Sequence, residues 1–266
     1  MVYNIYMNQR DRLKYLIEYL LSERNEDGEM PTDERGQKRL FRALVNVRMP
    51  RAASDEFLRV QDEYLREELR LKGVTDIANL VPVLGRPDLY LWQGDITTIG
   101  CDGIVNAANS QMLGCFCPNH GCIDNAIHTF AGVQLRQECA RVMEQQGRPE
   151  PTGTAKITSA YNLPCKYVLH TVGPIVYGEL TPRHEKLLED CYRSCLELAD
   201  SNGLQSLAFC CISTGEFRFP NERAAEIAIR TVEDYKRQTA SKIKVIFNVF
   251  KDCDYESYAR LLGTNR

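Results

Sequence analysis

The spacing of apolar residues divides the chain into two parts with different periodicities. In roughly the first seventy residues, apolar side chains recur at every third or fourth position, the spacing of a helix that buries one face. We predict a first helix from Leu13 to Leu21, a second that carries Leu40 to Val45, and a third with Ser54 as its N-cap. We find no catalytic motif before residue 85, so residues 1–75 are expected to form a helical cap or a substrate-docking region.

From about residue 84 the pattern changes to short apolar runs that alternate with helix-like segments. Residues 123–141 are expected to form one helix, and the strand-like runs are 89–93, 104–107, 153–158, 167–172, 207–212 and 245–249. Such alternation predicts an α/β fold with a mixed or largely parallel sheet and helices on both faces. Ligands of these sheets bind on the loops beyond the strand ends. We therefore expect a helical extension at residues 1–75 and an α/β domain at residues 76–266.

Composition narrows the classes of function. Of the 266 residues, 44% are hydrophobic and 26% are charged, which is typical of a globular protein in solution. A net charge of -3 argues against a dedicated nucleic-acid binder, which usually presents a basic surface. We find neither a membrane-spanning apolar run nor a signal peptide, and we expect a cytoplasmic protein without a membrane or nucleic-acid partner. Without a secretory signal, disulfides are not expected, and seven cysteines should act as small hydrophobes: Cys139, Cys165, Cys191, Cys195, Cys210, Cys211 and Cys253.

One connection, residues 105–127, concentrates side chains that can bind a metal or take part in chemistry. It contains Cys115-x-Cys117-x-x-His120-x-Cys122, and thiolates combined with imidazole are ligands that zinc prefers. Three such ligands would leave a fourth coordination position open, as a catalytic zinc requires, whereas four would make the zinc structural. The metal-free alternative is a group of buried or redox-active cysteines.

Two other loops at predicted strand ends contain polar residues suited to a ligand. Asp95 follows a strand and could accept a hydrogen bond from a ligand amino group, although a turn or helix cap is the simpler interpretation. Residues 213–219 lie between a strand and a helix, where free backbone N–H groups and the helix dipole favour an anion such as phosphate. This loop lacks the lysine of a P-loop, and taken alone its Ser, Thr and Gly are better explained by turn geometry.

Together, these motifs resemble those of the macrodomain family. The sequence contains, in macrodomain order, GDIT (94–97), VNAANS (105–110), IDNAIH (123–128), KYVLHTVGP (166–174) and STGEF (213–217). The resemblance covers roughly residues 84 to 264, and the joint occurrence of its motifs is highly specific. It implies a three-layer α/β/α fold with a mixed central sheet and a site for ADP-ribose. A large branch of the family hydrolyses ADP-ribose from modified proteins.

One departure from that branch resembles the zinc-dependent bacterial macrodomains. Where the hydrolytic branch has a glycine-rich run, this chain has GCFCPNHGC at residues 114–122, and the zinc-dependent group also carries a helical N-terminal extension. The resemblance implies Zn²⁺ as the cofactor, with Cys115, His120 and Cys122 as its ligands and Cys117 as an extra thiol nearby. It also implies a sirtuin-type ADP-ribosyltransferase as functional partner and a lipoylated carrier protein as a candidate substrate.

The resemblance also implies roles for individual residues. Asp95 would accept a hydrogen bond from the adenine amino group, with Ile96 beside it, and Phe219 would lie near the adenosine end. Asn109 would hold the distal ribose, and Asp124 would orient or activate water. The diphosphate would lie against the backbone N–H groups of Ser213, Thr214, Gly215, Glu216 and Phe217. The implied activity is zinc-dependent removal of mono-ADP-ribose from acidic protein side chains, and the alternative is a non-catalytic ADP-ribose reader with a structural zinc.

Overall fold

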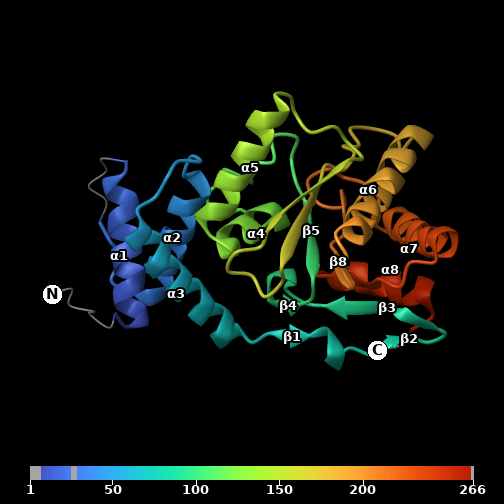
Figure 1. The fold of residues 1–266 in the computed structure, drawn as a ribbon, viewed down its shortest axis with the longest axis horizontal. Helices are drawn as coiled ribbons and strands as arrows, with labels where there is room; N and C mark the ends of the chain where they lie inside the picture. The colour runs from blue at the N-terminus through green and yellow to red at the C-terminus, as the bar shows by residue number, and fades with distance from the viewer. Residues whose placement is uncertain (1–6, 25–28, 265–266) are drawn as a thin grey trace.

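Three helices form the N-terminal part of the structure. The computed structural model describes residues 7–24 and 29–264. The helices are α1 (Gln9–Ser22), α2 (Glu34–Val47) and α3 (Asp55–Lys72), and they stand together at one end of the molecule (Figure 1). The predicted N-cap is confirmed, because the side chain of Ser54 accepts a hydrogen bond from the backbone N–H of Phe57 at 3.1 Å.

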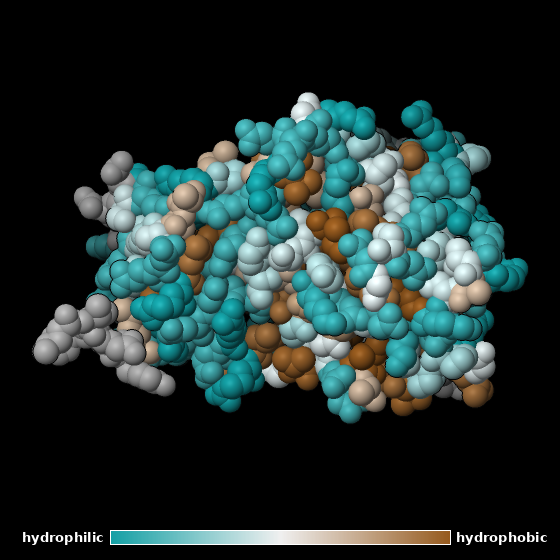
Figure 2. Space-filling model, in the orientation of Figure 1, coloured by the Kyte–Doolittle hydropathy of each residue, from teal (hydrophilic) through white to brown (hydrophobic). Residues whose placement is uncertain are grey.

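These helices bury an apolar cluster of their own. Their outer surface is mostly hydrophilic in Figure 2, as expected of amphipathic helices whose apolar faces point inward. Only one member of the cluster, Val133, comes from beyond the three helices. The buried members are Leu13, Leu16, Ile17, Leu20, Phe41, Leu44, Val45, Phe57, Val60, Tyr64, Leu65 and Val133. Val133 therefore joins the helical extension to the rest of the chain by direct packing.

A seven-stranded mixed sheet forms the centre of the remaining chain. Its strands are β2 (Pro82–Val83), β3 (Arg86–Gln93), β5 (Gly103–Ala107), β6 (Ala155–Ser159), β7 (Tyr167–Thr171), β8 (Ser206–Phe209) and β9 (Lys244–Val249). Their order is β2-β3-β9-β8-β5-β7-β6, with parallel pairing throughout except for the edge pairs β2–β3 and β6–β7. A separate parallel pair joins β1 (Thr75–Asp76) to β4 (Ile99–Gly100).

Helices cover both faces of the sheet, which confirms the predicted three-layer α/β/α fold. One face carries α4 (Ile123–Ala131) and α5 (Val133–Gln146), and the other carries α6 (Pro182–Ser201), α7 (Asn221–Thr239) and α8 (Asp252–Leu262) (Figure 1). The N-terminal helices pack against α4 on its far side from the sheet. Among the described residues, no helix is both long and apolar enough to cross a membrane.

The prediction of one helix over residues 123–141 is wrong, because the chain breaks at Gly132. This glycine has a φ of +99°, which separates α4 from α5. The side chain of Gln61 in α3 accepts a hydrogen bond from the backbone N–H of Val133 at 3.0 Å. A Cβ atom at position 132 would lie 2.7 Å from Nε2 of the same Gln61. The break is thus fixed by a tertiary contact with the helical extension.

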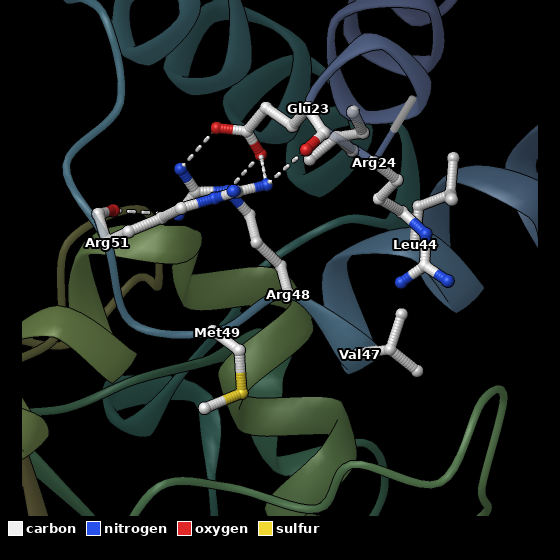
Figure 3. Close-up of a pocket in the computed structure, with 8 residues that line it drawn as sticks. Glu23, Arg24, Leu44, Val47, Arg48, Met49 and Arg51 are labelled. Carbon is white, nitrogen blue, oxygen red and sulfur yellow. Dashed lines mark hydrogen bonds and ion pairs between the residues drawn. The ribbon is translucent and has the colours of Figure 1, made fainter. Parts of the chain in front are cut away.

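A buried ion pair closes the end of the helical extension nearest α5. Arg48 donates two hydrogen bonds of 2.8 Å to the carboxylate of Glu23, and Arg51 adds an ion pair of 3.0 Å (Figure 3). Burial opposes ionisation of Glu23, but these arginines hold its pKa below the usual value. The carbonyl of Arg48 in turn accepts a hydrogen bond from Arg136 of α5. The cavity of about 300 Å³ beside this pair is lined by α1, α2 and the segments that directly follow these two helices.

The cysteines are all free thiols, as expected without a disulfide framework. Cys139, Cys165, Cys191, Cys195 and Cys210 are buried, and Cys211 is partly buried. The prediction fails for Cys253, which is exposed at the start of α8.

Candidate active site with a candidate metal centre

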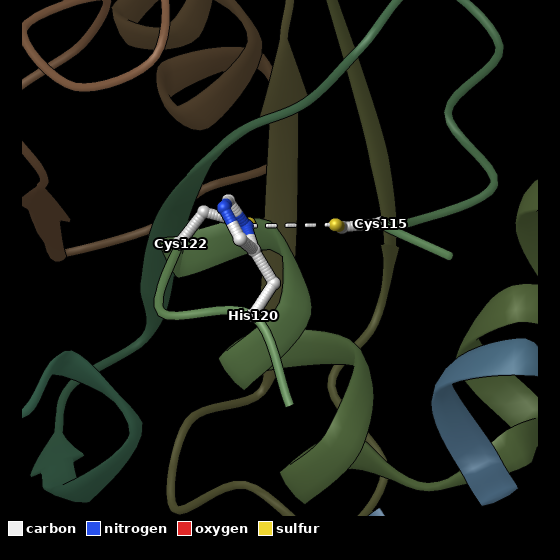
Figure 4. Close-up of side chains that lie close together, drawn as sticks. All are labelled: Cys115, His120 and Cys122. Atoms are coloured by element: carbon white, nitrogen blue, oxygen red, sulfur yellow. Dashed lines mark hydrogen bonds between the residues drawn. The ribbon is translucent and has the colours of Figure 1, made fainter. Parts of the chain in front are cut away.

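The connection from β5 to α4 brings three potential metal ligands together. The Sγ atom of Cys115 lies 3.7 Å from Nδ1 of His120, and the ligand atoms of Cys115, His120 and Cys122 all lie within 4.8 Å of one another (Figure 4). All three residues are partly buried. Cys117 does not belong to this group, and its side chain is exposed. We call residues 115–122 the metal loop.

The geometry and chemistry of these donors fit a zinc ion. Zinc bonds of about 2.3 Å to sulfur and about 2.1 Å to nitrogen, set at the tetrahedral angle, place the two donor atoms about 3.6 Å apart. The observed separation of 3.7 Å between Cys115 and His120 is close to this value. Burial, reinforced by the nearby Cys115 and Asp124, raises the pKa of Cys122 to about 12. A bound cation would stabilise the Cys122 thiolate, which this environment otherwise disfavours.

Asp124 is held at the start of α4 directly beside the metal loop. Asp124 is only 5% exposed, and its Oδ1 accepts a hydrogen bond of 2.8 Å from Asn106. Asn109 lies on the other side and donates a longer bond of 3.4 Å to Oδ2. Burial raises the pKa of Asp124 to about 6, despite the opposing effect of the Asn106 hydrogen bond. The two residues predicted to be catalytic, Asn109 and Asp124, are therefore adjacent.

Asn106 is a site residue that we did not predict. It occupies the fully buried interior of β5, where its Nδ2 also donates to Nδ1 of His170 at 3.1 Å. The other ring nitrogen of His170 must then carry the proton, and it lies 2.9 Å from the hydroxyl of Thr158. Burial lowers the pKa of His170 to about 3, so the ring is neutral. Asn106 could have been identified from the sequence as a site residue, because it is a polar residue in an otherwise apolar strand.

Behind Asp124 lies a second group of potential ligands, formed by His128, Cys139 and His170. All three are fully enclosed in the core. Burial lowers the pKa of His128 and raises that of Cys139, so both groups are uncharged.

The loop after β8 presents free backbone donors. The N–H groups of Gly215, Glu216 and Phe217 form no hydrogen bond with any described residue. Ser213 and Arg218 adopt positive φ values of 66° and 57°, so the backbone turns sharply on either side of these donors. Consecutive N–H groups in such a turn form a concave site that favours an anion. We call residues 213–217 the anion loop, which matches the segment predicted to hold a diphosphate.

The anion loop also approaches the metal loop. The carboxylate of Glu216 lies 3.5 Å from Nε2 of His120, and its side chain is 72% exposed. His120 therefore directs Nδ1 toward Cys115 and Nε2 toward an acidic group. This is the arrangement in which a carboxylate orients a metal-binding imidazole. We predicted only the backbone of Glu216 to take part.

The residues predicted at the adenosine end, Asp95, Ile96 and Phe219, differ in their surroundings. Oδ1 of Asp95 caps a short 3-10 helix (Ile96–Thr98), while Oδ2 lies 3.4 Å from Nζ of Lys72. Ile96 packs in the core with an exposed fraction of 5%. Phe219 is also a core residue and is only 1% exposed. Phe217 is partly exposed.

The fold and these loops define an α/β protein with a candidate anion site and a candidate metal centre on the loops that follow the central strands β5 and β8. A model of the Macro domain family matches residues 105–228. The chain is 59% identical to the protein-ADP-ribose hydrolase of Treponema medium, over 97% of this chain and 100% of that protein. It is 51% identical to the protein-ADP-ribose hydrolase of Staphylococcus aureus strain MSSA476, over 94% of this chain and 95% of that protein. The chain belongs to the macro domain family.

A solved structure shows the same fold. The macrodomain of Trypanosoma brucei in complex with ADP-ribose superposes with a TM-score of 0.65 and is 31% identical. The match covers 89% of this chain and 97% of that one. The predicted family is thus confirmed.

Proposed function

We propose that this protein is a zinc-dependent hydrolase that removes mono-ADP-ribose from acidic side chains of modified proteins. The observation that carries the proposal is the metal cluster of Cys115, His120 and Cys122, placed two residues before a buried Asp124. The bacterial relatives named protein-ADP-ribose hydrolases support the reaction class. The relative solved with ADP-ribose supports the ligand.

The chain's own residues bind and orient the substrate at three points. The N–H groups of the anion loop would bind the diphosphate, and Asp95 would accept the adenine amino group. Asn109 would hold the distal ribose beside Asp124. Asp124 would orient water and accept its proton. A zinc ion held by Cys115, His120 and Cys122 would supply Lewis acidity, which polarises an oxygen of the substrate and lowers the pKa of bound water.

The proposed reaction consumes one water molecule. Water adds to the reacting carbon, and the bond between the distal ribose and the protein carboxyl oxygen breaks. The products are ADP-ribose and a free carboxylate side chain, with one proton released. Two thiolates and one neutral histidine make the zinc centre formally neutral, which weakens its Lewis acidity, so positioning of the ribose contributes to the rate as well.

The proposal includes partners and a location. The modification would be made by a sirtuin-type ADP-ribosyltransferase, and a lipoylated carrier protein is the proposed substrate. The reaction would take place in the cytoplasm, where the thiol ligands stay reduced.

One experiment tests the proposed function directly. The purified protein is analysed for zinc and incubated with a protein automodified on acidic residues, with and without a chelator. We expect about one zinc per chain and release of free ADP-ribose that the chelator abolishes. Binding of ADP-ribose without release would instead indicate a non-catalytic reader. Release unaffected by complete zinc removal would contradict the metal's role.

Replacing Cys117 with serine is expected to leave the zinc content and the hydrolysis rate unchanged. The reason is that Cys117 is exposed and lies outside the ligand cluster, so the fourth coordination position does not depend on it. Zinc content by elemental analysis and the rate of ADP-ribose release check this result. Loss of the metal in the variant would show that four protein ligands close the site.

A further inference from the structure

The helical extension contacts the metal loop through two side chains of α2, Arg42 and Asn46. We propose that Arg42 is a positioning residue that fixes the metal loop and the first turn of α4, so that α2 of the helical extension forms part of the candidate active site. The inference deepens the proposed function and rests on it for the identity of the metal. Its structural basis is a set of hydrogen bonds between side chains and backbone groups of this chain.

Arg42 holds two points on either side of Cys122. Its Nη2 donates to the carbonyl oxygen of His120 at 2.9 Å and to Oδ1 of Asn125 at 2.8 Å. Its Nε donates to the same Oδ1 at 3.1 Å. A rigid planar guanidinium fixes both distance and direction between the groups it joins. The backbone of one ligand residue is thereby fixed relative to the helix that carries Asp124.

Asn125 links Arg42 to the first half of the metal loop by a further hydrogen bond. It is fully buried, and while its Oδ1 accepts from Arg42, its Nδ2 donates to the carbonyl oxygen of Cys117 at 3.0 Å. Its orientation therefore follows from the position of Arg42. The asparagine amide connects α2 with a backbone group that lies between the first two metal ligands.

Asn46, one helical turn after Arg42, holds the middle of the loop. Its Oδ1 accepts a hydrogen bond of 2.9 Å from the backbone N–H of Asn119, and its Nδ2 donates to Thr129 of α4 at 2.9 Å. Asn119 has a φ of +55°, an unfavourable conformation for a residue with a side chain. This contact stabilises the turn that brings His120 back toward Cys115. Arg42 and Asn46 thus lie on the same face of α2 and act on adjoining residues.

The beginning of the connection is also tied to α2, through Arg136 of α5. Arg136 donates to the carbonyl oxygen of Leu113 at 2.7 Å and to that of Val45 at 2.9 Å. Its guanidinium lies 4.4 Å from the ring centre of Phe116. The residues before Cys115 and those after Cys122 are therefore both linked by hydrogen bonds to α2, which lies outside the sheet domain.

The charge of Arg42 is not used in a salt bridge. Among the described residues, Arg42 forms no ion pair, and its acceptors are a carbonyl and an amide oxygen. Stabilising the extension alone would not require a charged side chain at this position. Its guanidinium binds the backbone of His120 and the side chain of Asn125 in α4. This geometry is better explained by a need to keep these two groups at a fixed distance from each other.

The test compares three variants of α2 in the full-length protein. Arg42→Ala removes the contacts, and Arg42→Lys keeps the charge but cannot reproduce the fork. Arg35→Ala is the matched control, because Arg35 is exposed on the same helix and forms no hydrogen bond or ion pair with any described residue. Hydrogen exchange of the metal-free proteins is measured by mass spectrometry, and zinc affinity is measured by competition with a chromophoric chelator.

We expect Arg42→Ala to accelerate exchange of residues 117–125 while exchange in β5 and β9 stays as in the wild type. Zinc affinity should fall by about 10-fold to 100-fold, the usual effect of losing a group that orients a metal ligand. Lysine should recover only part of this loss, and Arg35→Ala should match the wild type in both measurements.

Unchanged exchange in the metal loop would overturn the positioning role, and so would a uniform acceleration across the whole chain, which indicates general destabilisation. Full recovery by lysine would also overturn it, because charge alone would then suffice. If the wild type binds no zinc, the proposed function fails, and the exchange measurement still decides whether Arg42 fixes the loop.

Discussion

Replacement of Asp124 by asparagine is expected to lower the hydrolysis rate by about 10²-fold or more, the usual contribution of a general base. Asparagine keeps the shape of the side chain and an oxygen that can accept the hydrogen bond from Asn106. It removes the negative charge and the proton acceptor, so the loss should fall on kcat. Binding of ADP-ribose should persist, because the anion loop and Asp95 lie on other segments. Calorimetry of ADP-ribose binding and a release assay measure the two properties separately.

The matched control is Asp102→Asn. Asp102 precedes β5 at the opposite end of that strand and pairs with Lys166, so its charge is remote from the site. The control should hydrolyse the substrate at the wild-type rate. Normal hydrolysis by Asp124→Asn would show that the assigned base is wrong. Asp124→Ala is less informative by itself, since it leaves the buried Asn106 amide without its carboxylate partner, which costs about 1–3 kcal/mol of stability.

Elements whose signals are local in sequence could be predicted. The N-cap at Ser54 depends on residues three positions apart, and the strands of the central sheet show as short apolar runs. The likeness of the motifs to macrodomains also gave the three-layer fold. The clustering of Cys115, His120 and Cys122 was predictable because these ligands lie within eight positions of one another.

Features that depend on tertiary contacts could not be predicted. The break at Gly132 is held by Gln61, which lies 72 residues away from Val133. Arg42 reaches Asn125 over a sequence separation of 83 residues, and nothing in the pattern of α2 distinguishes it from the other arginines. The core packing of Phe219 could not be predicted, because an aromatic residue in a polar loop can face either a ligand or the core. Local composition does not decide which way such a side chain points.

Replacement of His120 by alanine is expected to remove the bound zinc and the hydrolase activity together. The cluster offers three protein ligands, so the variant keeps only Cys115 and Cys122. The Cys122 thiol lies in an environment that disfavours its charged form, because burial raises its pKa to about 12. Two ligands of this kind cannot hold zinc at submicromolar free concentrations as three do. Elemental analysis and the release assay on the same preparation measure both losses.

The protein should remain folded in this variant, because the cluster belongs to neither apolar core. Circular dichroism and retained ADP-ribose binding establish this point. His184→Ala is the matched control, since that histidine only completes the N-terminal cap of α6. Its zinc content and activity should equal those of the wild type. Full turnover by zinc-free His120→Ala would exclude a catalytic metal. Loss of both zinc and activity, with ADP-ribose binding intact, would assign the metal to the chemical step and not to ligand binding.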